Sequence, residues 1–151
     1  MGASGGAAGG VCRLSLHDAL PILGHQAGDQ IIRLMAKTLQ QSVKGRDTTA
    51  RYGGEEFAVI LPATKLEDAE RLAENIRRTV ETLDVVSENR SEAMGTITVS
   101  IGVACFQLGE PLARMIERAD QALYLAKSHG RNLVMSENDL LAGPAKSAAK
   151  A

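Results

Sequence analysis

The sequence predicts an α/β domain with a central mixed or antiparallel sheet flanked by helices. Apolar residues recur at helical spacing in three segments, and four shorter segments have the apolar or β-branched content of strands. Two of the strand segments are joined by a Gly-Gly pair, which is typical of a tight antiparallel hairpin. Helices and strands that are intermixed along one chain favour a sheet covered by helices.

The composition fits one soluble domain of ordinary size. The 151 residues are 44% hydrophobic and 23% charged, and 17 basic residues nearly balance 18 acidic ones. This balance argues against a general nucleic-acid or membrane-surface binder, and no apolar run is long enough to cross a bilayer. Cys12 and Cys105 are far apart and not in a Cys-x-x-Cys pair, so we expect reduced thiols and a cytoplasmic location.

The expected elements follow the hydrophobic pattern in order. Pro111 opens the third helix and Gly130 is a suitable C-terminal cap for it. In chain order we expect a helix over 29–43, strands over 48–52 and 57–61 joined by Gly53 and Gly54, a helix over 66–83, a strand over 96–106, the third helix, and a last strand in "RNLVMS" (131–136).

The two ends of the chain differ from the middle. "MGASGGAAGG" is Gly/Ala-rich, and "VCRLSLHDALPIL" shows neither helical nor strand periodicity. We therefore predict a non-native or disordered leader over 1–23, a folded domain over 24–138, and a disordered tail over 139–151.

Polar residues gather in three clusters at the ends of elements: "GHQAGD" (24–29), "GGEE" (53–56) and "AKSHGRN" (126–132). Each has a structural interpretation, since Asp29 could cap a helix, the glutamates could be solvated turn residues, and Lys127 and Arg131 could complement a helix dipole. Together they supply acids for a hard cation, glycines that admit phosphates, and a Lys/Arg pair. These are the parts that a nucleoside triphosphate site requires.

Four stretches, "GHQAGD", "ARYGGEEFAVILP", "TVSIGVA" and "ADQALYLAKSHGRN", lie in the order and spacing of one known family. Over about residues 24–138 the chain resembles the GGDEF domain, the diguanylate cyclase family, in its Gly-Gly-Glu-Glu-Phe form. The resemblance implies a fold related to nucleotidyl-cyclase and polymerase palm domains. It also implies condensation of two GTP into cyclic di-GMP with release of pyrophosphate, Mg²⁺ or Mn²⁺ as cofactor, and a homodimer with one GTP in each subunit.

The resemblance also assigns roles to single residues. Gly53 and Gly54 make room for the GTP phosphates, Glu55 is a metal ligand, and Glu56 assists attack by the 3′-hydroxyl. Asp29 matches the residue that hydrogen-bonds guanine, whereas Lys127 and Arg131 match residues that hold the phosphates.

The chain departs from the family at the product-inhibition site, an Arg-x-x-Asp before the hairpin. Here the segment reads Lys44-Gly45-Arg46-Asp47. Lysine lacks the planar fork that binds guanine and phosphate in bidentate fashion, so we expect feedback inhibition through Lys44 and Asp47 to be weak.

A second departure lies upstream of "GH". Counting back from Gly24 at the family's spacing places Cys12 at the metal-binding Asp and Leu20 at the guanine-binding Asn. "LSLHDALPI" also back-translates to the end of a common sequencing adapter. We therefore expect a GGDEF fold that lacks its first strand and a chain with impaired turnover.

Two other functions remain open at this stage. The chain could be a degenerate GGDEF module that binds GTP or cyclic di-GMP and regulates a partner, or a small α/β interaction domain without a ligand. Intact Glu55, Glu56, Lys127 and Arg131 favour the enzyme. The sequence does not identify a sensor domain or the activating signal.

Overall fold

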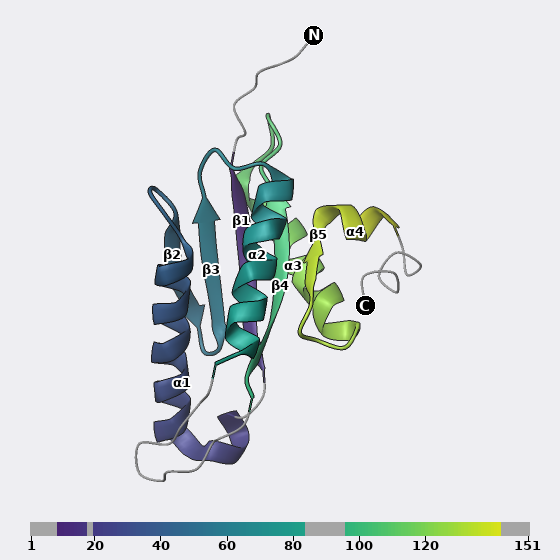
Figure 1. Cartoon of the computed structure of the whole chain (residues 1–151). Helices are drawn as coiled ribbons and strands as arrows, with labels where there is room; N and C mark the ends of the chain where they lie inside the picture. The colour runs from purple at the N-terminus through teal and green to yellow at the C-terminus, as the bar shows by residue number, and fades with distance from the viewer. Residues whose placement is uncertain (1–8, 18–19, 84–95, 143–151) are drawn as a thin grey trace.

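The computed structural model describes residues 9–17, 20–83 and 96–142, and within them five strands form one sheet (Figure 1). The strand order is β2-β3-β1-β4-β5; only the β4–β5 pair is parallel. The elements are β1 (Gly10–His17), α1 (Leu20–Ser42), β2 (Thr48–Gly53), β3 (Glu56–Leu61), α2 (Leu66–Glu81), β4 (Thr98–Cys105), α3 (Leu112–Ser128), β5 (Val134–Ser136) and α4 (Glu137–Ala142).

Helices cover both faces of this sheet. α1 and α2 pack on one face and enclose the main core, to which α1 contributes Ile31, Met35 and Leu39. α3 packs on the other face, where Met115 and Ala119 meet Val11 and Ala104. The expected mixed sheet flanked by helices is confirmed. No helix within the described ranges is long and apolar enough to cross a bilayer.

Strand β1 corrects the expectation that the sheet lacks its first strand. Gly10–His17 pairs with β3 on one side and β4 on the other, so it is the central strand of the sheet. Cys12, Leu14 and Leu16 are fully buried on the face that packs against α1 and α2. The prediction of no strand periodicity was wrong, because apolar and polar residues alternate from Cys12 to His17, but the segment was grouped with the Gly/Ala-rich stretch before it.

The predicted leader over 1–23 is therefore not disordered throughout. Residues 10–17 form β1, and α1 already begins at Leu20, with Pro21 in the first turn where proline is tolerated. Whether these residues are natural sequence is a separate matter that remains a prediction. Residues 1–8 and 18–19 lie outside the described part of the chain.

The earlier start of α1 changes the interpretation of Asp29. This residue lies inside the helix and is exposed, so it does not cap the helix N-terminus as one interpretation had it. The apolar face expected for the helix over 66–83 is confirmed, because Ala69, Ala73, Ile76 and Val80 of α2 are all buried.

α3 lies unusually close to β4 at Gly102. A Cβ atom at this glycine would lie 2.2 Å from the Ala119 carbonyl oxygen and 2.3 Å from the Leu123 nitrogen. Only a residue without a side chain permits this approach. The contact sets the distance between α3 and the sheet, and therefore the position of Lys127 in the last turn of the helix.

The C-terminal boundary lies beyond the predicted residue 138. Glu137–Ala142 forms α4, which packs against α3, and the buried Asp139 carboxylate accepts a hydrogen bond from the Ser136 backbone N–H at 2.8 Å. The prediction of a disordered tail over 139–151 is therefore wrong for residues 139–142. Residues 143–151 and the expected loop over 84–95 are outside the described ranges.

Candidate functional site

The Gly-Gly-Glu-Glu segment forms the turn between β2 and β3, one residue later than the sequence predicted. Gly53 pairs with Glu56, so Gly54 and Glu55 are the two central residues of the turn. The displacement arises because the strand register shifts between Arg51 and Gly53. Gly53 and Gly54 have φ angles of 147° and 52°, which favour glycine, and a Cβ at either would meet nothing within 4 Å. The space beside the turn is open.

Two sets of hydrogen bonds hold this turn in place. The Leu16 N–H of β1 donates to the Glu55 carbonyl oxygen at 3.0 Å. Arg51 donates from Nε and Nη2 to the Gly54 carbonyl oxygen at 3.2 and 3.0 Å. The exposed Glu55 side chain therefore stands on a backbone that is fixed from both sides.

The Glu56 side chain contacts Lys127, which lies on a helix packed against the sheet. The Lys127 Nζ lies 3.7 Å from the Glu56 Oε1, and both side chains are about one-third exposed, at 33% and 38%. Lys127 comes from the last turn of α3, whereas Glu56 opens β3. The structure thus brings together two of the predicted site residues from distant parts of the chain.

Arg13 contacts Glu56, and Asp120 and Tyr52 in turn contact Arg13; none of these three residues was predicted to have a role. The Arg13 Nη2 lies 3.6 Å from the Glu56 Oε2, and the Arg13 Nε lies 3.4 Å from the Asp120 Oδ1. The Arg13 guanidinium also lies 3.8 Å from the centre of the Tyr52 ring, within cation–π range. Asp120 belongs to a quoted motif, whereas Arg13 lies in the segment that was assigned to the leader.

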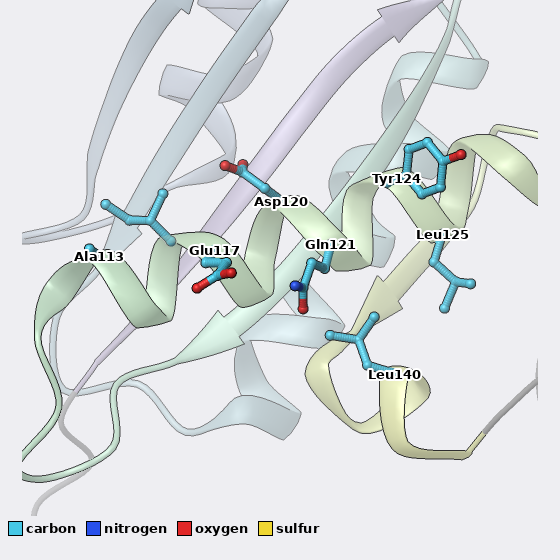
Figure 2. Close-up of a pocket in the computed structure, with 8 residues that line it drawn as sticks. Ala113, Glu117, Asp120, Gln121, Tyr124, Leu125 and Leu140 are labelled. Atoms are coloured by element: carbon cyan, nitrogen blue, oxygen red, sulfur yellow. The ribbon is translucent and has the colours of Figure 1, made fainter.

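Asp120 also borders a groove on the outer side of α3. Figure 2 shows its carboxylate on the opposite side of α3 from Leu140, which comes from α4. The groove is mostly apolar, lined by Ala113, Ile116, Glu117, Asp120, Gln121, Tyr124, Leu125 and Leu140.

The carboxylates at the turn suit a hard cation such as Mg²⁺ or Mn²⁺, with Glu55 as the freely exposed donor. The described residues contain no cluster of three or more potential metal-ligating side chains. Cys12, the residue counted to the family's metal-binding position, lies between Val59 and Val103 in mid-strand, and burial raises the pKa of its thiol to about 12. The β1 residue that pairs with Glu56 is Ser15.

Arg131 lies in a loop with an uncommon backbone. Gly130, Arg131 and Asn132 have φ angles of 109°, 64° and 50°, all in the left-handed region. The Arg131 N–H donates to the Ala126 carbonyl oxygen at 3.0 Å, which confirms Gly130 as the C-terminal cap of α3. The Arg131 side chain is exposed, and among the described contacts none joins it to Glu56.

Asn132 anchors this loop to α2 and β4. Its side-chain oxygen accepts from the Arg77 Nη1 at 2.9 Å, and its Nδ2 donates to the Glu81 Oε2 at 3.2 Å. The Asn132 N–H donates to the hydroxyl of the buried Ser100 at 3.2 Å. Arg77 also binds Glu74 and Glu81, each at 2.6 Å, so one guanidinium joins the loop to two carboxylates of α2.

Lys44 and Asp47 form a local turn. The Asp47 N–H donates to the Lys44 carbonyl oxygen at 3.1 Å, and the Lys44 N–H donates to the Asp47 carboxylate at 3.3 Å. The Lys44 side chain is exposed, so it is open to a ligand.

Comparisons with known proteins agree with this geometry. Residues 21–133 match the family described as diguanylate cyclase, GGDEF domain, and the chain belongs to this family. It is 47% identical over 112 residues to diguanylate cyclase VdcA of Vibrio cholerae serotype O1, covering 74% of this chain and 33% of VdcA. The chain therefore spans about a third of the length of this relative.

Two solved structures show the same fold. The GGDEF domain of DgcB from Caulobacter crescentus, in complex with c-di-GMP, superposes with a TM-score of 0.85 at 36% identity, covering 89% of this chain and 81% of that one. The active GGEEF domain of a diguanylate cyclase from Vibrio cholerae gives a TM-score of 0.76 at 30% identity, covering 85% and 82%.

Replacing Arg77 with leucine tests the anchor of the Arg131 loop. Hydrogen bonds from Arg77 lower the pKa of Glu74, and those from Asn132 and then Arg77 lower the pKa of Glu81, both from 4.5. Carboxylates with lowered folded pKa values stabilise the fold above the unfolded value, and the contribution disappears as the pH falls through the folded value. Arg77→Leu should therefore reduce stability most at neutral pH and least in acid.

The measurement is the midpoint of urea unfolding over a series of pH values. Arg78→Leu is the matched control, because Arg78 is exposed and, within the described ranges, its one ion pair is with Glu74 at 3.0 Å. If Arg77→Leu lowers the unfolding midpoint equally at every pH, or no more than Arg78→Leu does, the network does not anchor the loop.

Proposed function

We propose that this chain is a diguanylate cyclase domain, which condenses two GTP into cyclic di-GMP and releases two pyrophosphates. The observation that carries the proposal is the contact between Lys127 and Glu56 at the end of an open Gly-Gly turn. The contact places the Glu56 carboxylate and the Lys127 ammonium beside an accessible stretch of backbone. Membership of the GGDEF family supports the same chemistry.

Each of these residues has its own role in the reaction. The 3′-hydroxyl of one GTP attacks the α-phosphorus of the other, a new P–O bond forms, and the bond to the β-phosphate oxygen breaks as pyrophosphate leaves with the electron pair. Glu56 accepts the hydroxyl proton, and its carboxylate lies beside Lys127 and Arg13. Lys127 and Arg131 bind phosphate oxygens, and Gly53 and Gly54 leave room for them.

Glu55 would hold Mg²⁺ or Mn²⁺, which when bound neutralises charge on the triphosphate. Turnover by this chain should be slow, because the buried thiol of Cys12 stands where the resemblance places the second metal-binding acid. Each copy of the domain holds one GTP, so the active form is a homodimer. We place it in the cytoplasm, where GTP is available and the free thiols of Cys12 and Cys105 stay reduced.

Feedback by the product should be weak in this chain. Lys44 presents a single ammonium where the family has an arginine, and Asp47 already accepts a hydrogen bond from the local backbone. The alternative function is a GGDEF module that binds GTP or cyclic di-GMP and regulates a partner without turnover. The exposed Glu55 and the Glu56–Lys127 pair favour the enzyme.

Conversion of GTP to cyclic di-GMP by the full chain tests the proposal, with Glu55→Gln as the variant. The wild type should form product slowly, and Glu55→Gln should lose at least about tenfold of that rate because the metal loses its carboxylate. Glu67→Gln, the same change at an exposed acid of α2, should match the wild type. Binding of GTP without product in the wild type would instead establish the binding module.

Asp29 should select guanine over adenine. Its position inside α1 removes the capping role, and an exposed carboxylate can accept from both the N1–H and the 2-amino group of guanine. Asp29→Asn should narrow the preference for GTP over ATP in an equilibrium titration, with Asp68→Asn on α2 as the control. An unchanged preference would remove Asp29 from the site.

A further inference from the structure

Arg13 is a charged side chain in the middle of the sheet. It lies on the central strand β1, on the face that packs against α3, and is only 5% exposed. A buried guanidinium is unfavourable unless opposite charges or acceptors surround it. Here the surroundings are the carboxylates of Glu56 and Asp120 and the ring of Tyr52.

These contacts bring the charges close without full hydrogen bonding. The Arg13 nitrogens lie 3.6 Å from Glu56 and 3.4 Å from Asp120, and the buried Arg13 Nε has no hydrogen-bond partner among the residues that the structure describes. By contrast, Arg118 reaches Glu137 at 2.6 Å. The two carboxylates near Arg13 are therefore held by its charge more than by directed hydrogen bonds. They stay partly in solvent, at 38% and 48% exposure.

We propose that Arg13 is a built-in cation that lowers the affinity of this end of the sheet for divalent metal ions. The guanidinium neutralises Glu56 and Asp120, and its charge opposes the entry of a second cation beside them. The guanidinium lies 3.6 Å from the Glu56 carboxylate, so solvent screens its repulsion of an incoming cation only in part. The inference rests on the proposed function in so far as Glu55 and Glu56 belong to the nucleotide site.

The competing explanation is purely structural. In that case Arg13 fills space between β1, Tyr52 and α3, and its replacement changes stability while leaving cation affinity as it was. Since buried ion pairs are often replaced by apolar side chains at little cost in stability, the two explanations can be separated with a folded variant.

The experiment titrates Mn²⁺ alone, without nucleotide, into the full chain and follows free Mn²⁺ by electron paramagnetic resonance. Arg13→Met removes the charge and keeps a long unbranched side chain, whereas Arg13→Lys keeps the charge. Arg13→Met should bind Mn²⁺ about tenfold or more tightly than the wild type, and Arg13→Lys should stay close to it.

Two controls locate the effect. Arg78→Met makes the same change in net charge at an exposed position on α2 and should leave the affinity unchanged. Adding Glu56→Gln and Asp120→Asn to Arg13→Met should abolish the gain. If Arg13→Met does not fold, as judged by circular dichroism, Arg13→Gln carries the same expectation.

The proposal is overturned if the charge-removing variant binds Mn²⁺ no more tightly than the wild type. It is equally overturned if Arg78→Met gives the same gain, or if the gain survives loss of both carboxylates. Because no GTP is present, failure here is distinct from failure of the cyclase proposal. A chain that binds Mn²⁺ as expected but forms no product would refute only the latter.

Discussion

The hydrogen bonds along both edges of β1 connect the two halves of this sheet. On one side β1 pairs with β3 and through it with β2, and on the other it pairs with β4, which carries β5. Glu56 belongs to the first half, and Lys127 belongs to a helix that packs on the second. Their contact therefore exists only because β1 holds the halves at a fixed separation. The N–H of Leu16 also fixes the Gly-Gly-Glu-Glu turn directly.

Close packing on β4 determines the rest of the site geometry. Gly102 lets the α3 backbone approach the sheet more nearly than any side chain would allow, which places the last turn of the helix beside Glu56. The chain then leaves the helix through three left-handed residues, and Asn132 fastens this loop to α2. The positions of Lys127 and Arg131, the two cations proposed to bind phosphate, thus depend on the packing at Gly102 and on the contacts of Asn132.

Local pattern predicted most of the elements. The buried stripe of α2, the run in β3 and the cap at Gly130 each follow from residues adjacent in sequence, and all three are present. β1 was missed although Cys12 to His17 alternate between apolar and polar residues, because the segment was grouped with the Gly/Ala-rich stretch before it. The start of α1 was missed because Gly24 reads as a boundary, yet the helix continues through it.

The site was predicted in part for a similar reason. Glu55, Glu56 and Lys127 lie in motifs whose residue types match their chemistry, and the structure joins two of them. The contacts of Arg13 with Glu56, Asp120 and Tyr52 link three strands and a helix, so they depend on topology that no local pattern contains. The displaced turn likewise depends on a register shift between paired strands.

The central claim is that residues 10–17 are the middle strand of the folded domain, and the reactivity of Cys12 tests it most directly. Its thiol is fully buried between β3 and β4, whereas Cys105 at the end of β4 is partly exposed, so Cys105→Ala leaves Cys12 as the single thiol. Labelling of this variant with a thiol reagent under native conditions should be limited by unfolding and should become fast only in denaturant. Labelling as rapid in buffer as in denaturant would show that the segment is a leader outside the sheet.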